Sequence, residues 1–242
     1  SYRYAGASES VNNFVCFGST TSPCSEDNLY RIIGVFEDKV KLIKYDYANS
    51  NLLGTDGDYK GSSTPNASYY KGSLTSIDVY YWNNVTKKNT WSESNLNKIN
   101  LNTNFINNIG STWANKIATT TWKVGGNTYS NIYSKTPSVV YQNEIVNPVT
   151  TNTTDNATEY TAKIGLMYAS DYGFAASPSA WTKNLYNYNG SDANETSITT
   201  INWMYMGFDE VTMTPFSSYS EFVFSLYADG QVSSDAAASS LC

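Results

Sequence analysis

The sequence of 242 residues contains no histidine. Histidine is the most common general base, a frequent zinc ligand, and the base of the Ser-His and Cys-His nucleophile systems. The glycine loops that bind phosphates in P-loop and dinucleotide-binding proteins are missing as well. We therefore expect a protein that is not an enzyme, with no catalytic residue, no metal site and no cofactor.

Positive charge is scarce. Arginine occurs only at Arg3 and Arg31, and 21 acidic residues outnumber 15 basic ones, for a net charge of −6. Proteins that bind nucleic acids need a basic face to meet the phosphates. The composition therefore argues against nucleic acid as a partner.

Long hydrophobic runs are absent too. No apolar stretch has the length of a membrane span, and no signal peptide precedes the opening residues SYRYAG. We interpret the chain as a mature or trimmed extracellular domain whose anchoring segment is missing, so that it meets a membrane only through that segment. A soluble cytosolic protein is the alternative.

Only three cysteines are present. Cys16 and Cys24 lie in CFGSTTSPC, where Gly18 and Pro23 favour a turn. This spacing predicts a local disulfide in a secreted protein, with two reduced thiols as the alternative. Cys242 is then an odd thiol, either exposed or paired outside the chain.

The residues that are abundant favour β-structure, because Tyr and Thr fit pleated, half-exposed strands. Residues 30–36 and 39–45 predict a hairpin, and TWSESNLNKINLNTNFINNIG predicts a helix with Thr90 and Glu93 as a capping pair. TTTWKVGGNTYSNIYS predicts two strands around a turn. AKIGLMYAS, INWMYMG, DEVTMT and EFVFSLYADGQV predict further strands, the last with a turn at Asp229-Gly230. SDYGFAA predicts the start of a helical turn with Ser170 as its cap.

Acidic residues form no convincing site. Asp209 and Glu210 are adjacent, and neighbouring side chains of a strand point to opposite faces. TDGDYKG has acidic residues at two positions of a calcium loop, but Lys60 occupies a ligand position, and Ala67 stands where the loop needs glutamate. Both features are therefore interpreted as structural.

Several long blocks carry a family resemblance. LYRIIGVFEDKVKLIKYDYA, NTWSESNLNKINLNTNFINNIGSTWANKIATTTWKVGGN, YQNEIVNP and AKIGLMYASDYGFAASPSAW resemble an uncharacterised domain family of exported and prepilin-like proteins of Gram-positive bacteria. The resemblance covers most of residues 2–232. It implies an extracellular location on the bacterial cell surface and no enzymatic activity.

The late segment of that family is similar to the C-type-lectin fold. The resemblance implies an α+β fold of mostly antiparallel sheets with two or more short helices, in a single surface domain over residues 1–242. The chain ends at Cys242, where the family continues with a final strand of the type Arg-Pro-apolar. We therefore expect a domain that lacks its last C-terminal strand.

The end of the chain differs in composition from the rest. All 28 asparagines lie at or before Asn202, and the last 40 residues have none. A buried terminal sheet excludes asparagine, but the polar runs SSYS and SSDAAASS do not resemble a core. A diversity-generating retroelement, which rewrites adenines in a C-terminal gene segment, explains residues 232–242 better, with low-complexity drift or a polar loop as the alternatives.

These observations predict a binding face on the late strands, made of side chains on the outer side of the sheet. The predicted ligand-binding residues are Tyr205, Asp209, Tyr219, Ser225, Tyr227, Asp229, Ser233, Ser234 and Asp235. Phe224, Leu226 and Val232 are the expected core positions on the opposite side.

The predicted function is an adhesin-like domain that binds a protein or glycan ligand on another cell or surface. The alternative is a pilin-like structural subunit that assembles with copies of itself. A carbohydrate-processing enzyme is the least favoured class.

Overall fold

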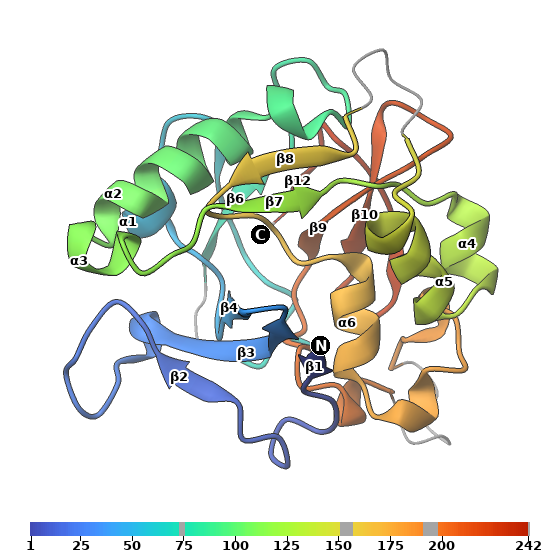
Figure 1. Cartoon of the computed structure of the whole chain (residues 1–242), viewed down its shortest axis with the longest axis horizontal. Coiled ribbons are helices and arrows are strands. Elements are labelled where there is room, and N and C mark those ends of the chain that lie inside the picture. Colours follow the sequence, from blue (N-terminus) through green and yellow to red (C-terminus); the bar gives the residue numbers. More distant parts are fainter. Residues whose placement is uncertain (73–75, 151–156, 191–197, 242) are drawn as a thin grey trace.

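The computed structural model describes residues 1–72, 76–150, 157–190 and 198–241. In these residues small antiparallel sheets combine with short helices, in agreement with the predicted mixed architecture. Figure 1 shows α1, α2 and α3 on one side of the molecule and α4, α5 and α6 on the other. No helix of the described residues has both the length and the apolar character of a membrane span.

The first sheet is built around the predicted hairpin. β3 (Leu29–Phe36) and β4 (Lys39–Lys44) pair antiparallel, and the turn between them places Glu37 at a positive φ of 55°. β1 (Tyr2–Arg3) and β2 (Phe14–Cys16) also pair with β3, so the start of the chain is fixed against its longest strand.

The predicted helix over residues 90–110 is present but begins later. A single 3-10 turn at Trp91–Glu93 precedes a π-helical segment, Leu96–Phe105, which continues as α2 (Ile106–Asn108). The side chain of Thr90 makes no capping bond, so the predicted capping pair is wrong. Instead Ser94 Oγ accepts a bond of 3.2 Å from the backbone N–H of Asn97.

Short elements surround this helix. α1 (Ser50–Leu53) packs beside it, and α3 (Ser111–Ala114) follows Gly110, which has a φ of 82°. Further single-turn helices occur at Glu26–Asn28, Pro178–Ala180 and Leu185–Asn187.

A second sheet receives the end of the chain. β5 (Tyr59–Ser63) and β12 (Ser240–Leu241) lie on either side of β6 (Ile77–Tyr81). Ala237, just before β12, is fully buried. Of residues 233–239, Ser233 and Ala237 are buried and the others are partly exposed, so the low-complexity end is core-like only in part.

Two predicted strands are replaced by other structure. β7 (Thr120–Lys123) pairs with β8 (Glu159–Ala162), but the predicted strand after β7 is a helix, α4 (Tyr129–Ser134). Thr128 Oγ1 accepts a bond of 3.1 Å from the backbone N–H of Asn131, which caps α4. The predicted buried strand from Ala162 leaves the sheet at once and leads irregularly into α6.

The helices after α4 follow in close succession. α5 (Pro137–Tyr141) passes into a π-helical turn at Gln142–Val146. α6 (Ala169–Ala175) is capped when Asp171 Oδ2 accepts a bond of 2.9 Å from the backbone N–H of Tyr168. Ser170, the expected cap, lies inside this helix.

The late strands form a third sheet, in the order β11 (Val232–Ala236), β10 (Phe222–Leu226), β9 (Glu210–Pro215). The predicted turn contains Gly230 at a φ of 96°. INWMYMG is not a strand, since the 3-10 helix Ile198–Ile201 enters it and only an isolated bridge follows.

Both faces of this sheet are covered. Phe224 and Leu226 lie in one hydrophobic core, as predicted, together with Val232. Val223 and Met213 lie in a second core, with Trp82 and the π-helical segment. A sheet that is buried on both sides exposes neither face to solvent. A binding site therefore cannot lie on a face of this sheet.

Candidate binding site

The late sheet does not expose the predicted binding face. Tyr205, Ser225 and Ser233 are buried, so their assignment to an exposed face is wrong. For Ser225 and Ser233 the reason is the second core, which covers the side of the sheet that was expected to face solvent, whereas Tyr205 lies in the first core. Asp209 and Tyr219 are exposed, while Tyr227, Asp229, Ser234 and Asp235 are partly exposed.

Several of these polar groups hold the turn between β10 and β11. The hydroxyl of Tyr205 donates to the carbonyl of Ala228 at 2.7 Å, and that of Tyr227 donates to Ser234 at 2.7 Å. Asp229 Oδ1 accepts a bond of 3.0 Å from the backbone N–H of Gln231. These hydrogen bonds give the residues a structural role in the hairpin.

Tyr219 belongs to a different surface feature, which we call the aromatic row. Its six rings come from α4, from the turn Leu185–Asn187, from the connection between β9 and β10, and from the first residue of β10. They are, in spatial order, Tyr186, Tyr133, Tyr129, Phe216, Tyr219 and Phe222. Successive ring centroids lie 4.3, 5.7, 6.3, 6.4 and 6.2 Å apart.

Most of the aromatic row is open to solvent. Tyr219 is 58% exposed, and Tyr129, Tyr133 and Phe222 are exposed as well. Tyr129 and Tyr133 are four residues apart in α4, so they share one face of that helix. The sequence analysis missed this pair because it expected a strand, in which residues four apart lie much farther from each other.

The connection between β9 and β10 is fixed by Asn89. Its Nδ2 donates to the backbone carbonyls of Phe216, Tyr219 and Phe222, at 3.0, 2.9 and 2.8 Å. The backbone N–H of Asn89 also donates to Ser220 at 2.7 Å. One buried amide therefore positions three of the six rings in the aromatic row.

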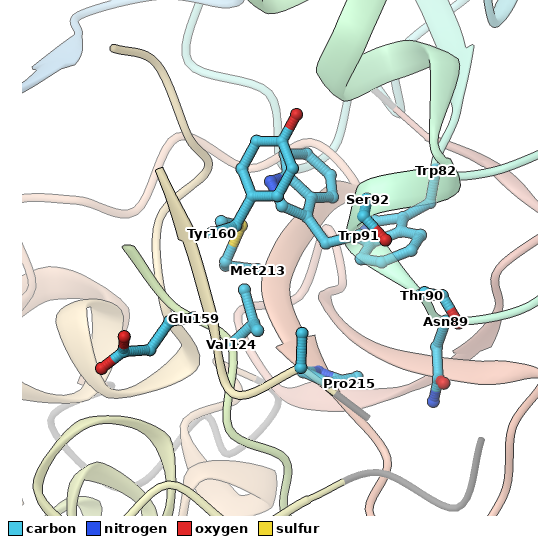
Figure 2. Close-up of a pocket in the computed structure, with 11 residues that line it drawn as sticks. Trp82, Asn89, Thr90, Trp91, Ser92, Val124, Glu159, Tyr160, Met213 and Pro215 are labelled. Atoms are coloured by element: carbon cyan, nitrogen blue, oxygen red, sulfur yellow. The ribbon is translucent and has the colours of Figure 1, made fainter. Parts of the chain in front are cut away.

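Beside this connection lies a hollow (Figure 2). Figure 2 shows Asn89, Thr90, Trp91 and Ser92 on one side of it, and side chains of β8 and β9 on the other. The lining residues are Trp82, Asn89, Thr90, Trp91, Ser92, Val124, Ala157, Glu159, Tyr160, Met213 and Pro215. The hollow contains about 350 Å³ of space, part of which is open solvent.

Two polar atoms of the hollow have no partner in the described residues. They are Oδ1 of Asn89 and Nε1 of Trp91, in residues that are 2% and 3% exposed. By contrast, the indole N–H of Trp82 donates to the carbonyl of Thr212 at 3.0 Å. Both atoms are themselves buried, and Figure 2 draws the Asn89 amide and the Trp91 indole nitrogen at opposite ends of the hollow.

A second hollow is lined by acidic and aromatic residues, including Asp46, Trp203 and Glu210. Burial raises the pKa of Glu210 to about 8, and the nearby charges of Asp46 and Asp209 add to the rise. Asp46 already accepts hydrogen bonds from the hydroxyl of Tyr70, at 3.0 and 3.1 Å.

A buried set of charged residues, which we call the ionic cluster, lies near α6. Asp171 pairs with Arg3 at 2.9 Å and with Lys41 at 2.5 Å. Although burial alone would raise the pKa of Asp171, the two cations outweigh that effect and hold it below its usual value. Arg3 and Lys41 also lie over aromatic rings, including Phe36 and Tyr168.

The ionic cluster also contains Glu144, a fully buried carboxyl. It accepts hydrogen bonds from the hydroxyls of Ser170 and Thr214, the latter at 2.6 Å. Burial raises the pKa of Glu144 to about 7. Because both carboxyls of this cluster are fully engaged by protein groups, we assign it to stability.

The cysteine prediction agrees with the structure, which joins Cys16 to Cys24 with Cα atoms 5.7 Å apart. Among the described residues, no group of three acidic or cysteine side chains is placed to hold a metal ion. Asp58, which belongs to the calcium-loop-like segment TDGDYKG, accepts a bond of 3.0 Å from the backbone N–H of Leu96.

Comparison with protein-family models, curated proteins and solved structures found no match to the chain.

Proposed function

We propose that this chain is a non-enzymatic binding domain of the bacterial cell surface, and that the aromatic row is its binding face. The observation that carries the proposal is the unbroken sequence of six rings, most of them exposed. Tyrosine gives a large contact area for a small loss of conformational entropy, and aromatic residues dominate binding hot spots.

We also propose that the chain belongs to the Gram-positive surface family, that its fold is C-type-lectin-like, and that it is extracellular. The ligand is a protein or glycan on another cell or surface. Retroelement diversification remains a proposal for exposed late positions. Tyr205, Ser225 and Ser233 are no longer included, because they are buried.

The first test asks whether the aromatic row binds a ligand or a second copy of the chain. Sedimentation velocity across a wide concentration range compares the wild type with the double variant Tyr133→Ala/Tyr219→Ala. We expect a monomer in both cases. Self-association that the double variant abolishes would overturn the proposal in favour of the pilin-like subunit.

The second test measures binding to an array of glycans and extracellular proteins. The double variant should lose about tenfold or more in affinity for any ligand that the wild type binds, equal to about 1.4 kcal/mol. Tyr2→Ala is the matched control, because Tyr2 is 59% exposed, close to the 58% of Tyr219, and lies outside the row. Equal losses in the control and the double variant would contradict the assignment.

A further inference from the structure

We infer that Tyr133 and Tyr186 form an oxidative cross-linking site, at which a one-electron oxidant joins the two rings as dityrosine. The inference goes beyond the proposed binding function and does not depend on any ligand. It is carried by the distance and tilt between the two rings, by their access to solvent, and by the separate segments of the chain that bear them.

The rings of Tyr133 and Tyr186 lie in close contact. Their centroids are 4.3 Å apart at an interplanar angle of 38°, which is the shortest distance between two tyrosine rings in the described part of the chain. Aromatic pairs in proteins usually keep their centroids about 4.5–7 Å apart, so this pair is unusually close. We therefore expect carbon atoms of the two rings to meet after small rotations of the side chains.

Both rings of this pair can be reached from solvent. Tyr133 is 49% exposed, and Tyr186 is partly exposed. An oxidant in solution can therefore take an electron from either ring. Oxidation of a phenol also releases the proton of its hydroxyl group, and water around these rings can accept that proton.

The other contacting tyrosine pairs of the described residues are less suited to coupling. One pair lies farther apart on a single helix, one meets edge-on at 89°, and two contain a buried ring. They are, in that order, Tyr129–Tyr133, Tyr2–Tyr4, Tyr59–Tyr80 and Tyr172–Tyr188. The comparison predicts that one link, between Tyr133 and Tyr186, dominates.

The reaction is an oxidative coupling. The oxidant removes one electron from each phenol, and each hydroxyl releases its proton to water. The two radicals form one carbon–carbon bond between ring carbons next to the hydroxyl groups. A hydrogen then moves from each of these carbons to its oxygen, through water, and restores both phenols. The product has lost two hydrogen atoms in all, as two electrons taken by the oxidant and two protons taken by water.

The link would act as a covalent staple. It would join α4 to the turn Leu185–Asn187, two segments that are far apart in the sequence. A cross-link between distant residues restricts the unfolded chain and so stabilises the folded state. In the extracellular location that we propose, disulfides persist because the reducing thiols of the cytosol are absent, and the same absence leaves one-electron oxidants free to act.

The experiment oxidises the dilute wild-type chain with a peroxidase and hydrogen peroxide, and then separates monomer from dimer by size-exclusion chromatography. We expect dityrosine fluorescence in the monomer and a mass lower by two hydrogen atoms. Peptide mapping should join Tyr133 to Tyr186. Dityrosine that occurs only in dimers, or that joins other residues of the monomer, would overturn the inference.

A pair of variants tests the same contact. Tyr186→Phe keeps the ring but cannot form a phenoxyl radical, so the dityrosine of the monomer should disappear. Tyr2→Phe is the matched control, because Tyr2 is 59% exposed and contacts another tyrosine, Tyr4, but only edge-on. It should form the link as the wild type does. A signal that survives in Tyr186→Phe, or that is lost in Tyr2→Phe, would contradict the assignment. If Tyr186→Phe does not fold, the peptide map of the wild type still decides the question.

Thermal melting tests the staple. The oxidised wild type should melt at a higher temperature than the untreated chain, whereas Tyr186→Phe treated in the same way should show no rise. An equal change in both proteins would show that the link does not staple the fold. The binding tests of the proposed function use the untreated chain, so the binding face and the cross-linking site can fail separately.

Discussion

The ionic cluster and the hollow are both buried and polar, and they meet at β9. Thr214 donates to Glu144 in the cluster, whereas the next residue, Pro215, lines the hollow. In the cluster each carboxyl has several partners within the chain. In the hollow, Asn89 and Trp91 each leave one atom unpaired.

This difference bears on the stability of the fold. A partnered buried group adds to the folded state only while its partners remain, so its removal is costly. An unpaired buried group makes no such contribution. If this is correct, the loss in free energy of unfolding on removing a buried polar group should depend on whether that group has hydrogen-bond or ion-pair partners.

The largest effect is expected for Asp171→Ala. This change leaves Arg3 and Lys41 buried without their anion, and breaking a buried pair in this way costs about 3–5 kcal/mol. Urea unfolding should measure the loss. Asp38→Ala is the control, because the pair of Asp38 with Lys39 is exposed to solvent and its loss should leave the free energy of unfolding nearly unchanged. Similar losses in both variants would contradict the comparison.

The next effect is a dependence of stability on pH that comes from Glu144. Its pKa is raised from 4.5 to about 7 on folding, so the folded state retains a proton that the unfolded chain releases. Stability from this group is therefore complete below pH 4.5 and falls as the pH rises through about 7, by roughly 3 kcal/mol. Raising the pH should lower the urea midpoint of the wild type.

Glu144→Gln isolates this contribution, since Glu210 also has a raised pKa, about 8, and acts in the same direction. We expect the variant to show a weaker fall in stability between about pH 5 and pH 8 than the wild type. A fall of equal size in both proteins would show that Glu144 is ionised in the folded state.

The sequence was sufficient for features that depend on local patterns. The hairpin of β3 and β4 and the turn at Gly230 were predicted because turn residues interrupt β-rich runs. The strand predicted over α4 failed because Thr128 acts as a helix cap, a signal visible in the sequence but outweighed by its β-favouring neighbours.

The candidate site could not be predicted in the same way. Asn89 reaches partners 127 to 133 residues away, and no local pattern relates these positions. Tyr219 was selected correctly as an exposed late residue, but Ser225 was not, because the second core on the other side of β10 was unknown. Period-two alternation identifies two faces of a strand and cannot say that both are buried.

A smaller effect is expected for Thr214→Val, which keeps the shape of the side chain and removes the bond of 2.6 Å to Glu144. Leaving this acceptor with fewer donors should cost about 1–3 kcal/mol, measured by urea unfolding. A change within about 0.5 kcal/mol would indicate that the cluster tolerates a missing partner, and would weaken the contrast with the hollow.

The smallest effect is expected for Ser225→Ala, also on the late sheet. The hydroxyl of Ser225 is fully buried and, like the two atoms of the hollow, has no partner in the described residues. Removing it breaks no hydrogen bond, so the free energy of unfolding should stay within about 0.5 kcal/mol of the wild type or rise. Urea unfolding of Ser225→Ala beside Thr214→Val makes the comparison directly, because both variants lose one buried hydroxyl from neighbouring strands. A loss as large as that of Thr214→Val would mean that the Ser225 hydroxyl has a partner in the folded chain.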